Sequence, residues 1–241
     1  MIGTGTLINT ACVLGGGIVG LFTGKLFRAE QQDALTKACG VSVIFIAIAG
    51  AMEGMLRIES GALTSGRSML VVLCLALGTA LGEALGIERG FERFGEWLKR
   101  RTGSGGDPRF VDAFVTASMT VCVGAMSIVG AIEDGLQNDA SLLLVKSVLD
   151  FITVSVMTAS MGRGSIFAAI PLFLFEGGVT LLARLIAPVM TDEAIRSLAL
   201  VGSALIFCVG VNLVWGKRLR VANMLPATVL AVLAAYLPLS L

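Results

Sequence analysis

Eight apolar stretches, each about as long as a membrane-crossing helix, follow one another along this chain of 241 residues. A helix needs about 20 predominantly apolar residues to cross the hydrocarbon core of a bilayer. Glycine, proline and charged residues separate the stretches and favour turns between helices. We therefore predict eight spans, near residues 4–24, 34–56, 69–87, 110–133, 141–161, 165–187, 195–214 and 222–240.

The composition supports a membrane location. Hydrophobic residues make up 56% of the chain, charged residues only 15%, and the mean hydropathy is +0.89. A soluble domain of this length cannot cover so much apolar surface with so few charges. The net charge of +1 gives no indication of nucleic-acid binding. We expect an all-α, polytopic membrane protein in which residues 1–241 form a single membrane domain in contact with the lipid bilayer.

The distribution of basic residues predicts the orientation of the spans. The odd-numbered loops hold 13 of the 18 lysines and arginines, and the third loop alone holds six of them. Loops with an excess of lysine and arginine usually stay on the cytoplasmic side. The odd loops are therefore predicted to be cytoplasmic, which places both termini outside.

The third loop contains an amphipathic segment. Apolar residues from Ile87 to Leu98 recur at helical spacing, and charged residues occupy the opposite face. A helix of this kind typically lies in the plane of the membrane surface. We predict a cytoplasmic interfacial helix over residues 88–101, followed by a linker at 102–109.

A constant offset relates two parts of the sequence. A shift of 162 residues aligns Gly15 and Gly16 with a second pair of glycines, and aligns Gly40, Ile44 and Phe45 with identical residues in the seventh predicted span. Spans 1–3 would then correspond to spans 6–8 in the opposite orientation. We predict inverted three-helix repeats flanking a central pair of spans, as in many transporters. The alternative is chance similarity between glycine-rich helices.

Glycines spaced four residues apart form a ridge on two of the predicted spans. This spacing lets the backbone of another helix approach closely. The second helix can belong to the same subunit or to another copy of the chain, and we expect a homo-oligomer. The ridges consist of Gly16, Gly20 and Gly24 in the first span and of Gly78, Gly82 and Gly86 in the third.

Charged side chains lie at or near the centre of two predicted spans. Lys146 and Asp150 lie one helical turn apart in the fifth span, and Glu176 lies near the centre of the sixth. A charge at the bilayer centre costs about 2.5–3.5 kcal/mol on insertion scales, so such groups usually pair or face a cavity. Lys146 and Asp150 can neutralise each other as a structural pair. Glu176 has no partner on its own helix, which makes it the stronger functional candidate.

Uncharged polar side chains accompany these charges. Serine and threonine hydroxyls often bond to their own helix, so packing is the alternative to a role in a pathway. The further candidates for a substrate or ion pathway are Asn9, Thr116, Ser118, Ser127, Asn212 and Asn223. Glu133 and Asp134, at the outer end of the fourth span, are either a cation-attracting mouth or a solvated helix end.

The residues needed for common enzyme chemistry are scarce. Histidine is absent, and the five cysteines fall singly in separate apolar segments without CxxC spacing. The chain has no HExxH motif and no phosphate-binding GxxxxGK[ST] loop. We therefore predict no catalytic residue, no metal site and no cofactor, and we expect that the protein is not an enzyme.

Six short motifs, most of them between residues 110 and 150, carry a resemblance to known proteins. They are Phe114-Val-Thr-Ala-Ser118, Cys122-Val-Gly-Ala-Met126, Asp134-Gly-Leu136, Ser141-Leu-Leu-Leu144, Lys146-Ser-Val-Leu-Asp150 and Asn223-Met-Leu-Pro-Ala227. In these motifs the chain resembles DUF554, the YdfK/YqgA-like family of bacterial inner-membrane proteins, over nearly its whole length. Glu133 and Phe151 depart from the family pattern, in which glutamine and glycine are expected. The resemblance implies a bacterial inner-membrane location and no particular chemistry.

Two functional hypotheses follow from these features. The polar fourth and fifth spans, the charged residues at mid-depth and the predicted repeat favour a channel or secondary transporter for a small ion or polar solute, with a polar site between spans 4, 5 and 6. The alternative is an oligomeric membrane scaffold or regulator that transports nothing and is held together by the glycine ridges.

Overall fold

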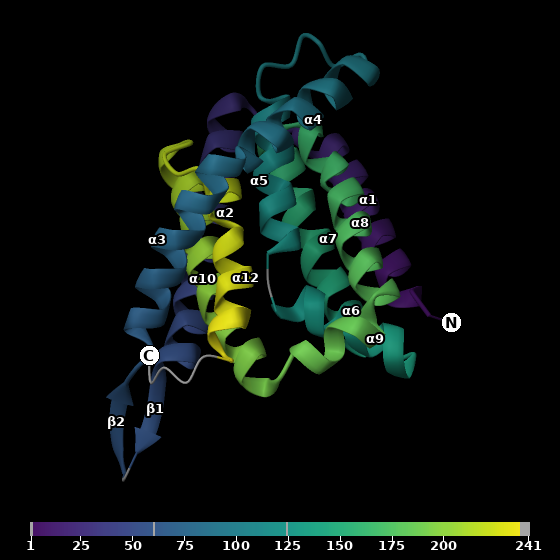
Figure 1. Ribbon diagram of the computed structural model, residues 1–241. Helices are drawn as coiled ribbons and strands as arrows, with labels where there is room; N and C mark the ends of the chain where they lie inside the picture. Colours follow the sequence, from purple (N-terminus) through teal and green to yellow (C-terminus); the bar gives the residue numbers. More distant parts are fainter. Residues whose placement is uncertain (1, 60, 124, 237–241) are drawn as a thin grey trace.

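Helices make up almost all of the computed structural model, which describes residues 2–59, 61–123 and 125–236 (Figure 1). The α-helices are α1 (Thr4–Gly24), α2 (Ala29–Met55), α3 (Ser68–Leu85), α4 (Ile87–Arg101), α5 (Phe110–Cys122), α6 (Ala125–Gln137), α7 (Ser141–Met161), α8 (Ala169–Leu181), α9 (Ala183–Ile186), α10 (Asp192–Trp215), α11 (Val221–Met224) and α12 (Pro226–Ala234). Two 3-10 helices are η1 (Arg163–Ala168) and η2 (Ala187–Val189). The strands β1 (Leu56–Glu59) and β2 (Ala62–Ser65) form an antiparallel hairpin. The predicted all-α membrane class is confirmed.

The predicted number of spans is not confirmed. Among the described residues, six helical segments are long and apolar enough to cross a membrane, and the number rises to seven if α5 and α6 count as one bent span. The predicted eighth span, 222–240, coincides with a shorter apolar helix over Val221–Ala234 and with residues outside the described ranges. Eight spans therefore stay a prediction.

The fourth predicted span, 110–133, is broken in the structure. Val123 adopts an extended backbone conformation that ends α5, and the axis of the following helix is inclined by 59° to that of α5. The sequence does not predict the break, because residues 113–132 contain no proline and no charged residue. It leaves the carbonyl groups of the last turn of α5 without partners inside the helix.

The long helices form two groups that lie side by side (Figure 1). In one group α1 packs along α7, with α5, α6 and α8 beside them. In the other, α2 packs along α10, and α3 packs along α12. Large apolar side chains point outward, among them Leu77, Val148 and Leu174, which are more than half exposed. Such a surface is costly in water and suits a lipid environment.

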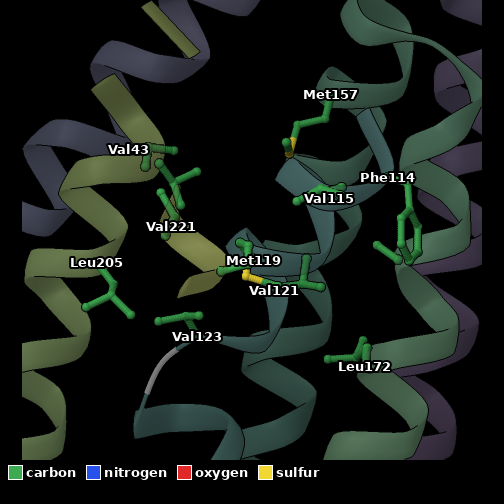
Figure 2. Close-up of a cluster of buried hydrophobic side chains, with 14 of the residues drawn as sticks. Val43, Phe114, Val115, Met119, Val121, Val123, Met157, Leu172, Leu205 and Val221 are labelled. Atoms are coloured by element: carbon green, nitrogen blue, oxygen red, sulfur yellow. The ribbon is translucent and has the colours of Figure 1, made fainter. Parts of the chain in front are cut away.

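Apolar side chains also fill the space between the two groups (Figure 2). Val43, Leu205 and Val221 come from the group around α2 and α10, and Met119 and Val123 come from the region of the break. Val43 and Val123 are 6% exposed, and the other three less. The two groups thus meet through buried hydrophobic contacts.

Both glycine ridges pack against helices of the same chain. A methyl group built on Gly16 or Gly20 would collide with the backbone of α7, at Phe151 and Ser155, and one on Gly24 would lie 2.9 Å from the Cα of Ala159. Methyl groups on Gly78 and Gly82 would collide with Ala227 and Asn223 of the α11–α12 segment. Gly86 differs, because its φ of +64° makes it the left-handed C-cap of α3. The remaining ridge positions are therefore covered within one subunit.

Helix α4 agrees with the predicted amphipathic segment to within one residue. It lies across one end of the bundle (Figure 1), where Phe94 packs edge-on against Phe114 of α5 with ring centroids 5.8 Å apart. Lys217, in the loop after α10, forms ion pairs with Glu88 and Glu92 of α4 at 3.0 and 2.5 Å. Residues 102–109 follow as a loop without regular structure. The position of α4 at a membrane surface stays a prediction.

The predicted inverted repeat is not confirmed. A methyl group on Gly40 would lie 2.8 Å from the Cβ of Leu213, whereas one on Gly202, its counterpart, would meet nothing within 4 Å. The environments of Gly16 and Gly178 differ in the same way. Aligned positions in the two parts of the sequence therefore have different packing.

Candidate intramembrane ion site

Four polar side chains from three helices meet in the interior of the first helix group. Asn9 comes from α1, Lys146 and Asp150 from α7, and Glu176 from α8. The side chains of Asn9 and Glu176 are fully buried, while Lys146 and Asp150 are 7% and 8% exposed as residues. We refer to these four residues as the charged cluster.

Lys146 lies between the two carboxylates. Its ammonium group donates a short hydrogen bond to Oδ2 of Asp150 and lies 3.5 Å from Oε1 of Glu176. The i, i+4 spacing on α7 places Lys146 and Asp150 on one face, as the sequence predicts. The approach of Glu176 depends on the packing of α8 against α1, which sequence spacing alone does not reveal.

Asn9 connects the two carboxylates. Its Nδ2 lies 3.1 Å from Oδ2 of Asp150 and 3.0 and 3.1 Å from the two carboxylate oxygens of Glu176. This orientation of the amide suits two ionised carboxylates, since its carbonyl oxygen would repel them. The Asn9 Oδ1 atom is buried and has no hydrogen-bond partner, so it remains available as an acceptor.

Close helix packing brings these groups together. Gly16 lies two turns beyond Asn9 on α1, and its lack of a side chain lets α1 approach the backbone of α7 at Phe151. Between α1 and α8, the hydroxyl groups of Thr6 and Thr180 hydrogen-bond at 3.2 Å, one turn from Asn9 and from Glu176 respectively. The charged cluster is thus held on both sides by helix–helix contacts.

The break between α5 and α6 adds a backbone carbonyl group to the surroundings of the charged cluster. Lys146 Nζ donates to the backbone carbonyl oxygen of Val121 at 2.9 Å. This carbonyl belongs to the last turn of α5, where the helix dipole favours a positive charge. The hydroxyl of Ser127, fully buried on α6, also donates to Val121 O at 3.4 Å.

The charges in the cluster do not balance. One ammonium group and two carboxylates have a net charge of −1 when all three are ionised. An uncompensated charge in a buried site is costly, so a proton or a bound cation is needed to complete the balance. A proton or a small cation bound in this site would complete the balance.

Several predicted pathway residues lie outside the charged cluster and bond to backbone groups. Ser118 donates to the carbonyl of Phe114 on its own helix. Asn212 holds the loop after α10 through the backbone of Arg218 and Leu219. Asn223 accepts from the backbone N–H of Glu88 at the start of α4. For Ser118, Asn212 and Asn223, bonds to backbone groups replace contacts in the cluster. Asn212 also lines the large cavity described below, so its place in a pathway stays a prediction.

The predicted outer mouth at Glu133 and Asp134 needs correction. Asp134 is fully buried, and its Oδ2 accepts from the backbone N–H of Gly5 at 2.9 Å in the first turn of α1. A carboxylate at this position satisfies a free helical N–H and complements the helix dipole. Glu133 is only partly exposed on α6. Asp134 therefore caps a helix and does not line a mouth.

A cavity of about 520 Å³ opens between the two helix groups at the end covered by α4. Thr116, one of the predicted pathway residues, lines it together with Asp112 of the same helix. Its deeper part reaches Met119, two residues before the carbonyl that binds Lys146. Lys217 also lines it, and although burial lowers the pKa of this lysine, hydrogen bonds to Glu92 and Glu88 raise it overall.

In the sequence, only one carboxylate inside a predicted span pointed to this cavity. Asp112 is a carboxylate inside the predicted fourth span, yet it was not among the candidate residues. The other charged lining residues, such as Asp33 and Arg109, lie near the ends of α2 and α5. In the sequence they look like ordinary solvated helix ends, and only the packing of the two helix groups brings them to one cavity.

The long apolar helices, the apolar outer surface and the buried charges together define a polytopic α-helical membrane protein. The chain belongs to the family described as "Protein of unknown function (DUF554)", whose model matches residues 4–236. The family resemblance found in the sequence is therefore confirmed.

Two relatives cover nearly the whole chain. "Uncharacterized membrane protein YdfK" of Bacillus subtilis (strain 168) is 27% identical over 223 residues, which are 92% of this chain and 91% of that protein. "Uncharacterized protein YqgA" of Escherichia coli (strain K12) is 26% identical over 227 residues, 94% of each chain. No solved structure shows a significant match.

Proposed function

We propose that this protein is a channel or secondary transporter for a small ion or polar solute, and that the charged cluster binds a cation or a proton during transport. The observation that carries the proposal is the buried net charge of −1 formed by Lys146, Asp150 and Glu176. A purely structural ion pair would need one carboxylate, not two. The second carboxylate gives the site capacity for an exchangeable positive charge.

The helix break supports this proposal. Broken helices at membrane depth occur where the free backbone groups are buried in protein or line a water-filled cavity. In many transporters such breaks coordinate ions through backbone carbonyl groups. Here the carbonyl of Val121 contacts the one buried cation of the cluster, Lys146.

The large cavity supports a path toward the cluster. It is polar near the ends of the helices and reaches Met119 and Val221 in its deeper part. Beyond these residues, the apolar side chains of Leu205 and Val123 fill the space between the two helix groups (Figure 2). Such an arrangement fits a transporter that is open to one side and closed to the other.

The second candidate function is a scaffold or regulator that transports nothing. The apolar interior of Figure 2 favours it, as do the direct contacts that Lys146 makes with both carboxylates. In that case the cluster would fix the register of α1, α7 and α8, and a permanently bound proton would neutralise it. The absence of enzymatic activity, the homo-oligomer, the inner-membrane location and the outward termini remain predictions under either function.

Ion flux in proteoliposomes separates the two functions. We would measure fluxes of protons, sodium, potassium and chloride for the wild type, Glu176→Gln and Asp150→Asn, with Glu96→Gln on the exposed face of α4 as the control. The proposal expects flux in the wild type and in Glu96→Gln, and a loss of at least tenfold in both cluster variants. Flux equal to that of empty vesicles for every ion would favour the scaffold.

A further inference from the structure

A second polar cavity lies at the opposite end of the molecule from α4, near the β-hairpin (Figure 1). Its volume is about 280 Å³, and it lies between the last turns of α2, the residue that precedes α3 and the first turns of α10. Three arginines line it, Arg57, Arg67 and Arg196, together with Ser203. None of these residues belongs to the charged cluster or to the large cavity.

The three guanidinium groups are close enough to influence one another. Burial lowers the pKa of Arg67, and the positive charges of Arg57 and Arg196 lower it further. Like charges repel, so their convergence on one cavity is unfavourable unless a negative group balances them. The three guanidinium groups therefore give the cavity more hydrogen-bond donors than acceptors.

Arg67 is fixed in place by the protein. Its side chain is 6% exposed and makes a short ion pair with Glu193, in the first turn of α10. It also has a φ of +64°, which residues other than glycine rarely adopt. Within the described residues, Arg57 and Arg196 have no ion pair within 4 Å and are exposed. One guanidinium is thus anchored, and two are free to bind.

The carboxylates nearby do not cancel this charge. Glu53 also lines the cavity, and Glu193 is occupied by Arg67. Three arginines against two glutamates leave a net charge of +1. The hydroxyl of Ser203 donates to the carbonyl of Ala199 on its own helix and therefore offers the cavity only an acceptor, beside Gly50.

We propose that Arg57, Arg67 and Arg196 form a binding site for a phosphate group. Guanidinium groups bind phosphate through paired N–H donors, and several arginines around one cavity suit its tetrahedral oxygens. The cavity lies where α2 ends and α3 and α10 begin, which is the level of lipid headgroups for helices that cross a bilayer. The phosphate can belong to an anionic phospholipid or to a free phosphate ion.

Ligand-dependent thermal unfolding of the purified protein in a neutral detergent tests this site. The two probes are inorganic phosphate, compared with chloride at equal ionic strength, and dihexanoyl phosphatidylglycerol, compared with dihexanoyl phosphatidylcholine. Two double variants, Arg57→Ala with Arg196→Ala and Arg57→Lys with Arg196→Lys, change the exposed arginines and leave the Arg67–Glu193 pair intact. The matched control, Arg93→Ala with Arg100→Ala, removes two exposed arginines from α4.

The site predicts that at least one probe raises the unfolding temperature of the wild type and of the α4 control. The alanine variant should need a probe concentration on the order of 100-fold higher, because two charge-assisted interactions are lost, and the lysine variant an intermediate one. Phosphatidylglycerol alone would identify a lipid headgroup, and inorganic phosphate would identify a soluble ion. Stabilisation by neither probe, or equal responses of both double variants and the wild type, would overturn the proposal. The result does not depend on whether the protein transports ions.

Discussion

Two residues, Asn9 and Lys146, each contact both carboxylates of the charged cluster. The amide group of Asn9 bonds to Asp150 and Glu176, and the ammonium group of Lys146 contacts the same two carboxylates. Without Lys146, the carboxylates of Asp150 and Glu176 would face each other in a buried site with only the amide between them. Without Glu176, a neutral pair of Lys146 and Asp150 would remain. The same site should therefore respond in opposite ways to the loss of a positive and of a negative charge.

Substitutions of single residues test this imbalance through stability. Lys146→Met should destabilise the protein by about 3–5 kcal/mol, because it leaves buried carboxylates uncompensated. Glu176→Gln should leave the unfolding temperature unchanged or raise it, because it removes the excess charge. The measurement is unfolding in mild detergent. Lys37→Met is the matched control, since Lys37 forms an exposed ion pair with Asp33 and its loss should cost no more than about 1 kcal/mol. Equal effects of the two lysine substitutions would contradict the account.

At the scale of elements, the close approach of helices depends on a few glycines. Helix α3 contacts the α11–α12 segment at Gly78 and Gly82, and α1 contacts α7 at Gly16 and Gly20. In a bilayer, where apolar surface brings little gain on association, such tight backbone packing supplies much of the attraction between helices. The glycines should therefore be sensitive to the addition of one methyl group.

Gly82→Ala should destabilise the bundle by about 1–3 kcal/mol, because the new methyl group collides with the backbone carbonyl oxygen of Asn223. Gly202→Ala on α10 is the matched control, since a methyl group there meets nothing within 4 Å. Its helix propensity should make it neutral or slightly stabilising, by up to about 1 kcal/mol. Unfolding temperatures of both variants in detergent give the comparison. A Gly202→Ala variant as unstable as Gly82→Ala would show that the contact at Asn223 is not the cause.

The elements that could be predicted were those with a local signal. Helix α4 has one apolar face over about four turns, and the sequence placed it within one residue of its observed start. The break after Cys122 has no such signal, because glycine and alanine around it are equally common inside packed membrane helices. The contact that accompanies the break, the bond from Lys146 to the carbonyl of Val121, joins two helices and has no signal in the local sequence.

The same distinction applies to the site. Lys146 and Asp150 could be paired from the sequence because both lie on one helix, and the lack of a same-helix partner singled out Glu176. That Asn9 joins them depends on how α1 packs between α7 and α8. Asn212 and Asn223 show the converse, because an asparagine near a helix end can bond to a loop backbone as well as to a solute.

At the scale of the whole molecule, the two ends differ, because the large cavity between the two helix groups opens at only one of them. The cavity is bordered by α4, by the first turns of α2 and by the loop after α10, whereas the β-hairpin lies at the other end (Figure 1). If the positive-inside rule holds for this chain, the cavity faces the cytoplasm. The side of the membrane on which the cavity opens therefore tests the predicted orientation.

Thiol labelling from each side of the membrane tests this direction. In a cysteine-free background, Thr116→Cys in the cavity should react with a membrane-impermeant reagent only in inside-out vesicles. Ser65→Cys on the exposed hairpin should react only in right-side-out vesicles or whole cells. The reverse pattern would overturn the predicted orientation. Labelling of both positions from the same side would contradict the arrangement of the cavity and hairpin at opposite ends.

The central claim is that the charged cluster exchanges a positive charge with water. Infrared difference spectroscopy of the purified protein reports protonated carboxyl groups directly, and it can follow them as the pH or the sodium concentration is changed. The account predicts a carboxyl band in the wild type that appears and disappears reversibly and is lost in Glu176→Gln, while Glu96→Gln behaves like the wild type. A spectrum that never changes with pH or cation, or that is identical in Glu176→Gln, would show a closed structural cluster and contradict the account.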